Sequence, residues 1–325
     1  MKKTLFAALA LVAMASCSNE EVIEMAQKEA IAFNNAFVNN STRSVNDPSF
    51  TNNKLFSEFK VYGYVNTFSL WTNGEVVTGT ALNGTWSYTN TQYWINGANY
   101  AFHAVAPATG WTATANESTG LTLSFSNSDG KSDVLYATAD AVGQASDNEQ
   151  VNLTFNHILS KVKFSFKNAY NGSNASIRVR NIKITNAYST GSVALPAKTW
   201  TTDNTKATLV LNFGNAATTA VDAEEPLAYN ATVESYNELL LIPNAVTGGY
   251  NVTFDVDLLV SDKVIETYQH TAKADFTPVA GFSYDINAEI SAKNIDPENP
   301  NGQEPIEFTV TEINDWTKGA DVTLQ

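Results

Sequence analysis

Three histidines are the residues of this chain best suited to bind a metal ion or to move a proton. His103, His157 and His270 are far apart in the sequence, and none has a second ligand at metal-binding spacing. We interpret His157, in Phe155-Asn156-His157, as a hydrogen-bonded structural residue. The chain has no Gly-x-Ser-x-Gly elbow, no His-Glu-x-x-His pair and no glycine-rich phosphate loop. The sequence therefore predicts a protein that is not an enzyme and needs no metal or cofactor.

Two carboxylates are spaced for acid–base chemistry. Asp255 and Asp257 stand at i and i+2 beside Phe254 and Val256, so they share one face of an expected strand. Paired carboxylates carry out glycoside hydrolysis, but a solvated strand face explains the same pattern, and we favour it. The segment 129–133 has too few oxygen ligands for a calcium loop.

Cys17 is the only cysteine, which excludes a disulfide-stabilised scaffold. Two lysines precede a short apolar run over residues 5–14, which has the shape of an export signal. The stretch Met14-Ala15-Ser16-Cys17 looks like a bacterial lipobox, in which the cysteine becomes the lipid-modified first residue. We predict a signal peptide over 1–16 and lipidation of Cys17. The alternative is an ordinary secretory signal with an incidental cysteine.

Arg43 lies in a polar loop, residues 39–48, of the kind that proteases cut. A trypsin-like enzyme would cleave between Arg43 and Ser44. We therefore predict proteolytic processing at this bond, with residues 17–43 as a propeptide.

Both ends of the chain carry a segment able to add a strand to a sheet. The N-terminal segment, 30–38, has large apolar residues of one parity, which an extended strand places on one face: Ile31, Phe33 and Phe37. The C-terminal set alternates with polar residues: Ile306, Phe308 and Val310. If cleavage let the first strand leave, a neighbour's strand could fill the open edge, and repetition would give an open filament. The alternative is that residues 306–325 complete their own domain.

Charge and periodicity limit the remaining classes. The net charge is −14, which leaves no basic footprint for nucleic acid. Hydrophobic residues make up 43% of the chain, enough for a core and against intrinsic disorder. Beyond Phe50 the apolar residues recur mostly at period 2, which predicts strands. The clearest strands are expected over 60–65, 100–105, 121–125, 151–155, 161–166, 177–184, 238–242, 250–257 and 284–290.

Many short strands separated by Gly, Asn and Pro clusters indicate β-sandwiches. We expect an N-terminal sandwich over 44–158 and a C-terminal sandwich over 159–295. Residues 296–325 are expected to form a linker followed by a possible donor strand.

Several stretches, in order, resemble the fimbrillin family of Bacteroidetes, the Mfa-like type V pilins. They are residues 14–17, 30–33, 41–43, 93–107, 133–137, 153–162, 239–243, 281–284 and 314–316. The resemblance implies an all-β fold of two transthyretin-like β-sandwich domains in tandem, after a lipoprotein signal peptide and a propeptide strand. It also implies trimming by an arginine-specific protease, with Arg43 at the matching position, and strand exchange into fimbriae for adhesion and biofilm formation.

The resemblance further implies partners and a location. The partners are other fimbrial subunits, the outer membrane through the lipid anchor before processing, and a receptor on a host or bacterial surface. Residues 18–21 resemble the acidic tract that directs lipoproteins to the outer surface of these bacteria. The expected location is the outer membrane surface and then the fimbrium, whereas a stalk, tip or anchor role stays open.

Aromatic residues leave one alternative function. Trp71, Trp86, Trp94 and Trp111 concentrate in the first expected domain, and Tyr93 with Trp94 precedes a glycine turn. Exposed aromatic rings would stack on sugars, although buried aromatics are commoner in sandwiches. The alternative is therefore a non-polymerising carbohydrate-binding surface lipoprotein.

Overall fold

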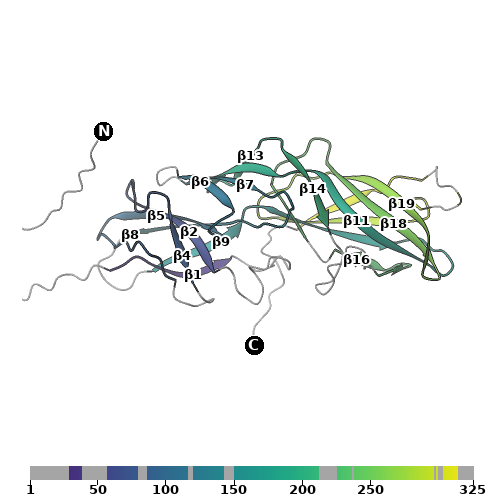
Figure 1. Ribbon diagram of the computed structural model, residues 1–325, viewed down its shortest axis with the longest axis horizontal. Helices are drawn as coiled ribbons and strands as arrows, with labels where there is room; N and C mark the ends of the chain where they lie inside the picture. The colour runs from purple at the N-terminus through teal and green to yellow at the C-terminus, as the bar shows by residue number, and fades with distance from the viewer. Residues whose placement is uncertain are drawn as a thin grey trace, which may run out of the picture.

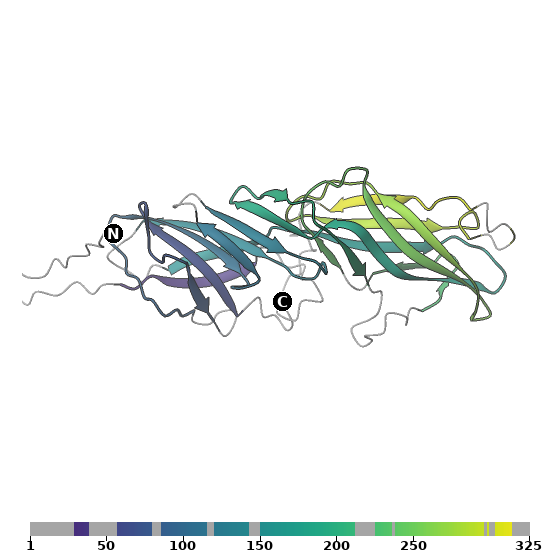
Figure 2. The ribbon, with the colours of Figure 1, turned by 45° about the horizontal axis from the view of Figure 1, so that its top comes forward.

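A computed structural model describes residues 29–38, 57–79, 86–115, 120–142, 150–211, 225–235, 238–295, 298 and 303–313. These ranges are all-β and contain no helix, which confirms the predicted fold class. The molecule is elongated, with an N-terminal lobe at one end and a C-terminal lobe at the other (Figures 1 and 2). No helix within the described ranges has the length and hydropathy needed to cross a bilayer.

Two sheets form the N-terminal lobe. The larger has the order β1 (Ala32–Val38), β9 (Gln150–His157), β8 (Leu135–Val142), β5 (Asn99–Ala106), β2 (Glu58–Val65) and β3 (Phe68–Ser69), with β4 (Glu75–Thr78) also paired to β2. The smaller has the order β13 (Thr199–Thr202), β12 (Thr190–Leu195), β7 (Leu121–Ser126) and β6 (Trp111–Ala115). In β7, Leu121 and Leu123 are buried whereas Ser124 and Ser126 are exposed, so the period-2 pattern sets which face packs.

The larger sheet curls around its own core. Ser87 exchanges both backbone hydrogen bonds with Thr78 of β4, and Tyr93 bridges Ala30 just before β1. The segment 86–94 therefore links the two ends of the sheet. Inside lie fully buried side chains from several strands, among them Phe59, Phe102, Leu135 and Phe155.

The C-terminal lobe is a sandwich of two five-stranded sheets. One has the order β16 (Thr232–Glu234), β10 (Ser160–Asn168), β20 (Ser283–Ile290) and β21 (Phe308–Ile313), with β17 (Leu239–Leu241) also paired to β10. The other has the order β14 (Lys206–Leu211), β11 (Ala175–Tyr188), β18 (Tyr250–Val260) and β19 (Lys263–Ala274), with β15 (Leu227–Ala228) also paired to β11. Inward-facing residues of both sheets, such as Phe164, Phe166, Val256 and Ile286, form one continuous core.

The lobes share a sheet at their junction. The β12–β13 hairpin lies between β11 and β14 in sequence, yet β12 pairs with β7 of the N-terminal lobe over six residue pairs, from Thr190↔Ser126 to Leu195↔Leu121. Gly120, at the start of β7, has φ +141°, and a Cβ there would lie 1.8 Å from the Leu195 carbonyl oxygen. Only glycine allows this approach.

Hydrogen bonds reinforce the junction. The Trp200 indole N–H donates to Ile158 O (2.9 Å), and Asn127 Nδ2 donates to Leu240 O (2.9 Å). One apolar cluster combines Leu123 of the N-terminal lobe with Leu240. The lobes are therefore joined by packing and a sheet as well as by the chain. The domain boundaries stay a prediction, and the pairing of 190–202 across them is a feature that the sequence analysis did not anticipate.

Candidate functional site

Several predicted positions lie outside the described residues. These are the lipidation residue Cys17, the processing residues Arg43 and Ser44, the side chain of Phe37, and residues 314–325 of the tail. Lipidation and processing therefore stay predictions. The two terminal strands, in contrast, can be followed.

The predicted removable strand, β1, is an edge strand of the larger N-terminal sheet. It pairs in parallel with β9, from Ala32↔Gln150 to Val38↔Phe155. A register shift between Asn34 and Phe37 interrupts the strand, so Phe37 takes the position opposite Thr154. The unbroken alternation expected from Ile31 through Phe37 is wrong at this bulge, because an extra residue reverses the backbone alternation beyond it.

Phe33 fills an aromatic cage in the lobe core. It is 4% exposed, and its ring lies edge-on to Phe59 and Phe102, with both centroid distances 5.8 Å, and to Tyr88 at 5.7 Å. Ile31 is 1% exposed in the same core. Edge-to-face contacts add to the free energy that burial of these rings supplies. Among the described side chains of this segment, Ile31 and Phe33 are the ones buried in the core.

The segment 86–94 holds β1 from its other side. The Tyr88 hydroxyl donates to Ile31 O at 2.7 Å, and Ile31 N donates to Gln92 O at 2.8 Å. Trp94 N donates to Glu29 O at 2.9 Å. The start of β1 thus has backbone partners on this side, which an incoming strand would have to replace.

Glu75 fixes the segment that grips β1. Its carboxylate accepts hydrogen bonds from the backbone N–H groups of Thr89 and Asn90, both at 3.0 Å, and from Asn90 Nδ2 at 2.8 Å. Burial alone would raise the pKa of Glu75, but these hydrogen bonds outweigh it and hold the pKa below its ordinary value. Trp71 adds a hydrogen bond from its indole N–H to Asn90 O (2.8 Å).

The predicted donor segment lies in its own lobe in this structure. β21 pairs antiparallel with β20 over six consecutive residue pairs, from Ala288↔Phe308 to Ser283↔Ile313. Ile306 is buried, and Phe308 and Val310 are half-buried. The Phe308 ring lies 5.9 Å from Phe164, 6.1 Å from Phe166 and 5.9 Å from Phe254. A donor role in a neighbouring subunit stays a prediction, and it requires β21 to leave these contacts.

A clasp closes the loop that leads into β21. Glu304 N donates to Lys293 O at 2.8 Å, and Asn294 Nδ2 donates to Glu304 O at 3.1 Å. The Lys293 and Glu304 side chains form an exposed ion pair at 3.3 Å, and such a pair contributes little. We call Lys293, Asn294 and Glu304 the clasp. The clasp fixes the chain just before the first residue of β21, Phe308.

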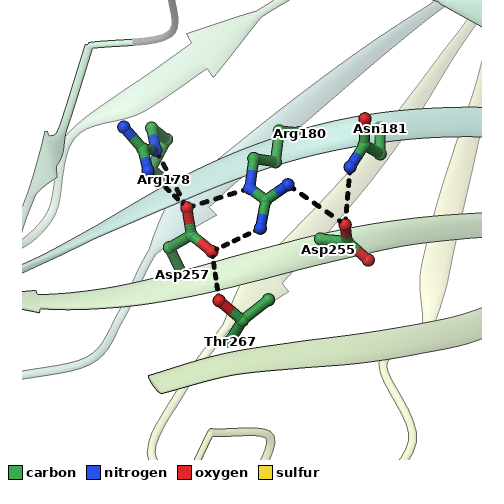
Figure 3. A network of polar contacts seen from close by, with 6 residues as sticks. All are labelled: Arg178, Arg180, Asn181, Asp255, Asp257 and Thr267. Carbon is green, nitrogen blue, oxygen red and sulfur yellow. Dashed lines mark hydrogen bonds and ion pairs between the residues drawn. The ribbon is translucent and has the colours of Figure 1, made fainter. Parts of the chain in front are cut away.

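The carboxylates of β18 are bound to arginines (Figure 3). Asp257 accepts hydrogen bonds from Arg178 and Arg180 at 2.6 to 3.0 Å and from the Thr267 hydroxyl at 2.7 Å. Burial alone would raise the pKa of Asp257, but the hydrogen bonds from Arg180, Thr267 and Arg178 lower it to about 2. Asp255 accepts from Asn181. Asp255 and Asp257 share one face of the strand, as expected. Asp257 is, however, buried and ion-paired with two arginines, so it is neither a solvated carboxylate nor a proton donor.

The histidines have structural surroundings. His157 Nδ1 lies 2.7 Å from Asp133 Oδ2, as the sequence analysis expects of a hydrogen-bonded residue, and His103 Nδ1 lies 2.6 Å from the Tyr136 hydroxyl. His270 stacks on Phe254, and burial lowers its pKa. Among the described residues, no group of three or more His, Cys, Asp or Glu is arranged to hold a metal ion.

Trp94 does not form the platform that the carbohydrate alternative requires. It is 7% exposed and lies edge-on to Tyr100, with centroids 4.7 Å apart. Tyr93 is about half exposed but stands without Trp94 beside it on the surface. Trp71 and Trp94 are core residues of this lobe, whereas Phe68 and Tyr93 are exposed.

Sequence reasoning missed the residues that grip β1. Glu75, Tyr88 and Asn90 lie in a stretch rich in Asn, Thr and Gly, and no periodicity marks them. The strand residues Ile31 and Phe33, in contrast, were predicted, and Ile306-Glu307-Phe308 repeats their Ile-x-Phe pattern.

Comparisons with known proteins give a family match and several similar structures. The sequence profile described as fimbrillin-like matches residues 42–316. A structure described as a cell adhesion protein from Bacteroides ovatus has a TM-score of 0.50 and 17% identity, covering 90% of this chain and 99% of that chain. A counterpart from Bacteroides uniformis has a TM-score of 0.49 and 16% identity, with the same coverage. The fimbrial anchor protein Mfa2 from Porphyromonas gingivalis has a TM-score of 0.39 and 10% identity, covering 89% and 98%. No curated protein matches the chain.

Proposed function

The chain belongs to the fimbrillin-like family, and from that premise we propose that it is a structural subunit of cell-surface fimbriae that assembles by strand exchange. In this proposal it is exported as a lipoprotein anchored through Cys17 to the outer membrane. An arginine-specific protease then cuts after Arg43, and the subunits support adhesion and biofilm formation. The chain acts without catalysis and without a cofactor.

The observation that carries this proposal is the position of β1. Phe33 of β1 and Ile31 just before it are core residues, yet β1 is an edge strand at the N-terminal end of the described chain. A cut after Arg43 would sever that strand from the rest of the fold, leaving it held by non-covalent contacts alone. Its departure would uncover the cage around Phe59 and Phe102 and the unpaired edge of β9, which another strand can satisfy.

The anchors of β21 support it as the replacement strand. Ile306 and Phe308 repeat the Ile-x-Phe spacing of Ile31 and Phe33, and Phe308 already sits among three phenylalanine rings in its own lobe. An isoleucine and a phenylalanine two residues apart would project into the vacated cage on the same face. When β21 leaves its own lobe it loses its pairing with β20. Its contacts in the neighbouring subunit must compensate for that loss of stability.

Limited cleavage of the recombinant precursor tests the proposal. Trimming after Arg43 should release the β1 peptide and yield filaments, visible by size analysis and electron microscopy. An Arg43→Gln precursor is the control and should stay monomeric. If trimmed protein remains monomeric under all conditions, self-polymerisation is refuted. The remaining role in a fimbrium is then that of a tip or anchor subunit.

Two further variants separate the steps. Deleting residues 306–325 should block assembly while both lobes stay folded, whereas unfolding would show that the segment serves only its own lobe. Cys17→Ala should release the precursor from the membrane fraction, and continued retention would contradict lipid anchoring at that residue.

A further inference from the structure

A lysine and a glutamate are buried together on the C-terminal lobe, beside the junction. Lys161 is 5% exposed, and the Glu238 side chain is 12% exposed. Lys161 Nζ lies 3.1 Å from Glu238 Oε1. The other carboxyl oxygen of Glu238, Oε2, is buried and has no hydrogen-bond partner among the described residues. A buried polar atom without a partner lowers stability, so this ion pair does not fully satisfy the carboxyl group.

The strand register places the two side chains on one face of the sheet. Lys161 of β10 pairs with Leu240 of β17, and Glu238 precedes Leu240 by two residues. Because side chains alternate along an extended chain, all three project from the same side of the sheet, opposite the lobe core. Leu240 belongs to the apolar cluster at the junction. The fold therefore brings the amine to the carboxyl group and shields both from bulk water.

Two more charged residues influence the pair. Lys163 lies on the same face, and its Nζ is 3.6 Å from Asp285 Oδ1. Burial raises the pKa of Glu238, although the charges of Lys161 and Lys163 oppose that rise. The charge of Asp285 adds to the rise. These surroundings favour the protonated carboxylic acid at Glu238 more than an exposed site would.

We propose that Lys161 and Glu238 condense into an intramolecular isopeptide bond once the chain has folded. The neutral Lys161 Nζ donates its lone pair to the carboxyl carbon of the protonated Glu238 side chain. The C–OH bond then breaks, and the hydroxyl leaves with one amine proton as a molecule of water. The charge of Lys163 would stabilise the negative oxygen of the tetrahedral intermediate. No oxidant, reductant or further reactant is needed.

Proximity and burial both favour this reaction. An amine and a carboxyl group that the fold holds in contact have a high effective molarity. A neutral amide is also less costly to bury than two charges. Lys167 and Glu289 form a similar ion pair at 2.9 Å, but their side chains are 45% and 58% exposed. We expect no bond there, because water solvates both groups.

The bond would close residues 161–238 into a covalent loop. The β12–β13 hairpin, which pairs with β7 of the N-terminal lobe, lies inside that loop. The link would therefore reinforce the junction within a single subunit. It is independent of strand exchange, so either inference can fail without the other.

Mass spectrometry of the folded recombinant precursor tests the proposal. We expect the intact mass to be lower than the sequence mass by one water. After tryptic digestion, tandem spectra should show a branched peptide that joins the segments around Lys161 and Glu238, without cleavage after Lys161. The matched control is read from the same digest, in which the peptides containing Lys167 and Glu289 should stay linear. The full sequence mass and linear peptides throughout would overturn the isopeptide bond.

Two variants assign the lost water to this pair. Lys161→Arg keeps the positive charge and should restore the full sequence mass, whereas Lys167→Arg should still lack one water. Ring closure at Asp129-Gly130 would also remove a water, but mild base reverses it and leaves an amide bond intact. A loss that base reverses, or that persists in Lys161→Arg, therefore contradicts the proposal. Misfolding of a variant does not affect the test, because the branched peptide is sought in the unmodified chain.

Discussion

The two terminal strands use the same anchor in different settings. Ile31 and Phe33, at the start of β1, and Ile306 and Phe308, at the start of β21, pack into the core of their own lobe. β1 pairs in parallel with β9 and is interrupted by a bulge, whereas β21 pairs antiparallel with β20 over six unbroken pairs. Parallel pairing is slightly less stable per residue, and a bulge leaves a residue without a partner.

The difference indicates which strand is built to leave. β1 pairs with β9 as far as Val38, and its first residues are also held by the buried Ile31 and Phe33 and by the segment 86–94. β21 depends on a regular ladder and on the clasp. A cut after Arg43 would turn β1 into a separate peptide that dilution can remove, while β21 stays tethered to its lobe.

The largest expected effect tests the anchor of β1. Phe33→Ala should lower the free energy of unfolding of the precursor by about 3–5 kcal/mol, because it empties a buried aromatic cage. In trimmed protein that has lost β1, the free energy of unfolding should be the same whether it was prepared from the unmodified precursor or from Phe33→Ala. Urea denaturation of both forms measures this. A loss below about 1 kcal/mol in the precursor would show that β1 is not held by Phe33.

Phe308→Ala should cost less, roughly 2 kcal/mol, because Phe308 is half-buried where Phe33 is almost fully buried. The matched control is Val310→Ala, on the same face of β21, which should cost still less. The same urea denaturation measures both variants. If Phe308→Ala costs more than Phe33→Ala, the side-chain anchor of β1 is the weaker of the two, and the burial of Phe33 does not decide how firmly β1 is held.

Glu75→Gln should shorten the lifetime of the nicked complex, in which β1 is cut but still bound, and lower stability by about 1–2 kcal/mol at pH 7. The pKa of Glu75 is below its ordinary value in the folded chain. Its contribution is therefore present above its ordinary pKa and is lost as the pH falls through the lowered value. Acid should speed β1 release, and Glu75→Gln should flatten that pH dependence. Mass spectrometry of retained β1 peptide gives the rate, and Glu266→Gln is an exposed control.

Tyr88→Phe should have a smaller effect, about 1 kcal/mol or fivefold in β1 release rate, because it removes only the hydroxyl that donates to Ile31 O. The ring contact with Phe33 remains. Tyr229→Phe, at an exposed position, should change nothing. A release rate for Tyr88→Phe equal to that of the unmodified chain would mean that this hydrogen bond adds nothing to the grip on β1.

Asn294→Ala should lower stability by about 1–3 kcal/mol, since the buried Asn294 side chain bonds Ser291 N and Glu304 O, although the β20–β21 ladder is untouched. It should nevertheless raise hydrogen exchange at the start of β21. Unchanged exchange from Phe308 to Val310 would show that the ladder alone retains the strand.

The fold was predictable where the signal is local. Leu121, Leu123 and Phe125 alternate with polar residues, and they form β7 with its apolar side inward. The anchors Ile31 and Phe33 were predictable for the same reason. Pairing partners were not, because the contact of β7 with β12 joins residues about seventy positions apart. The bulge after Asn34 was also missed, since it depends on how distant segments pack.

The shared sheet at the junction has a mechanical consequence. Along the chain, the backbone crosses between the lobes at 158–159, at Ser189 and at 203–205. Tension along the long axis would be divided among these crossings, and separating the lobes would require β12 to slide along β7 against six residue pairs at once. A fibre made of such subunits would be stiff within each subunit. Under load it should yield first where one subunit meets the next.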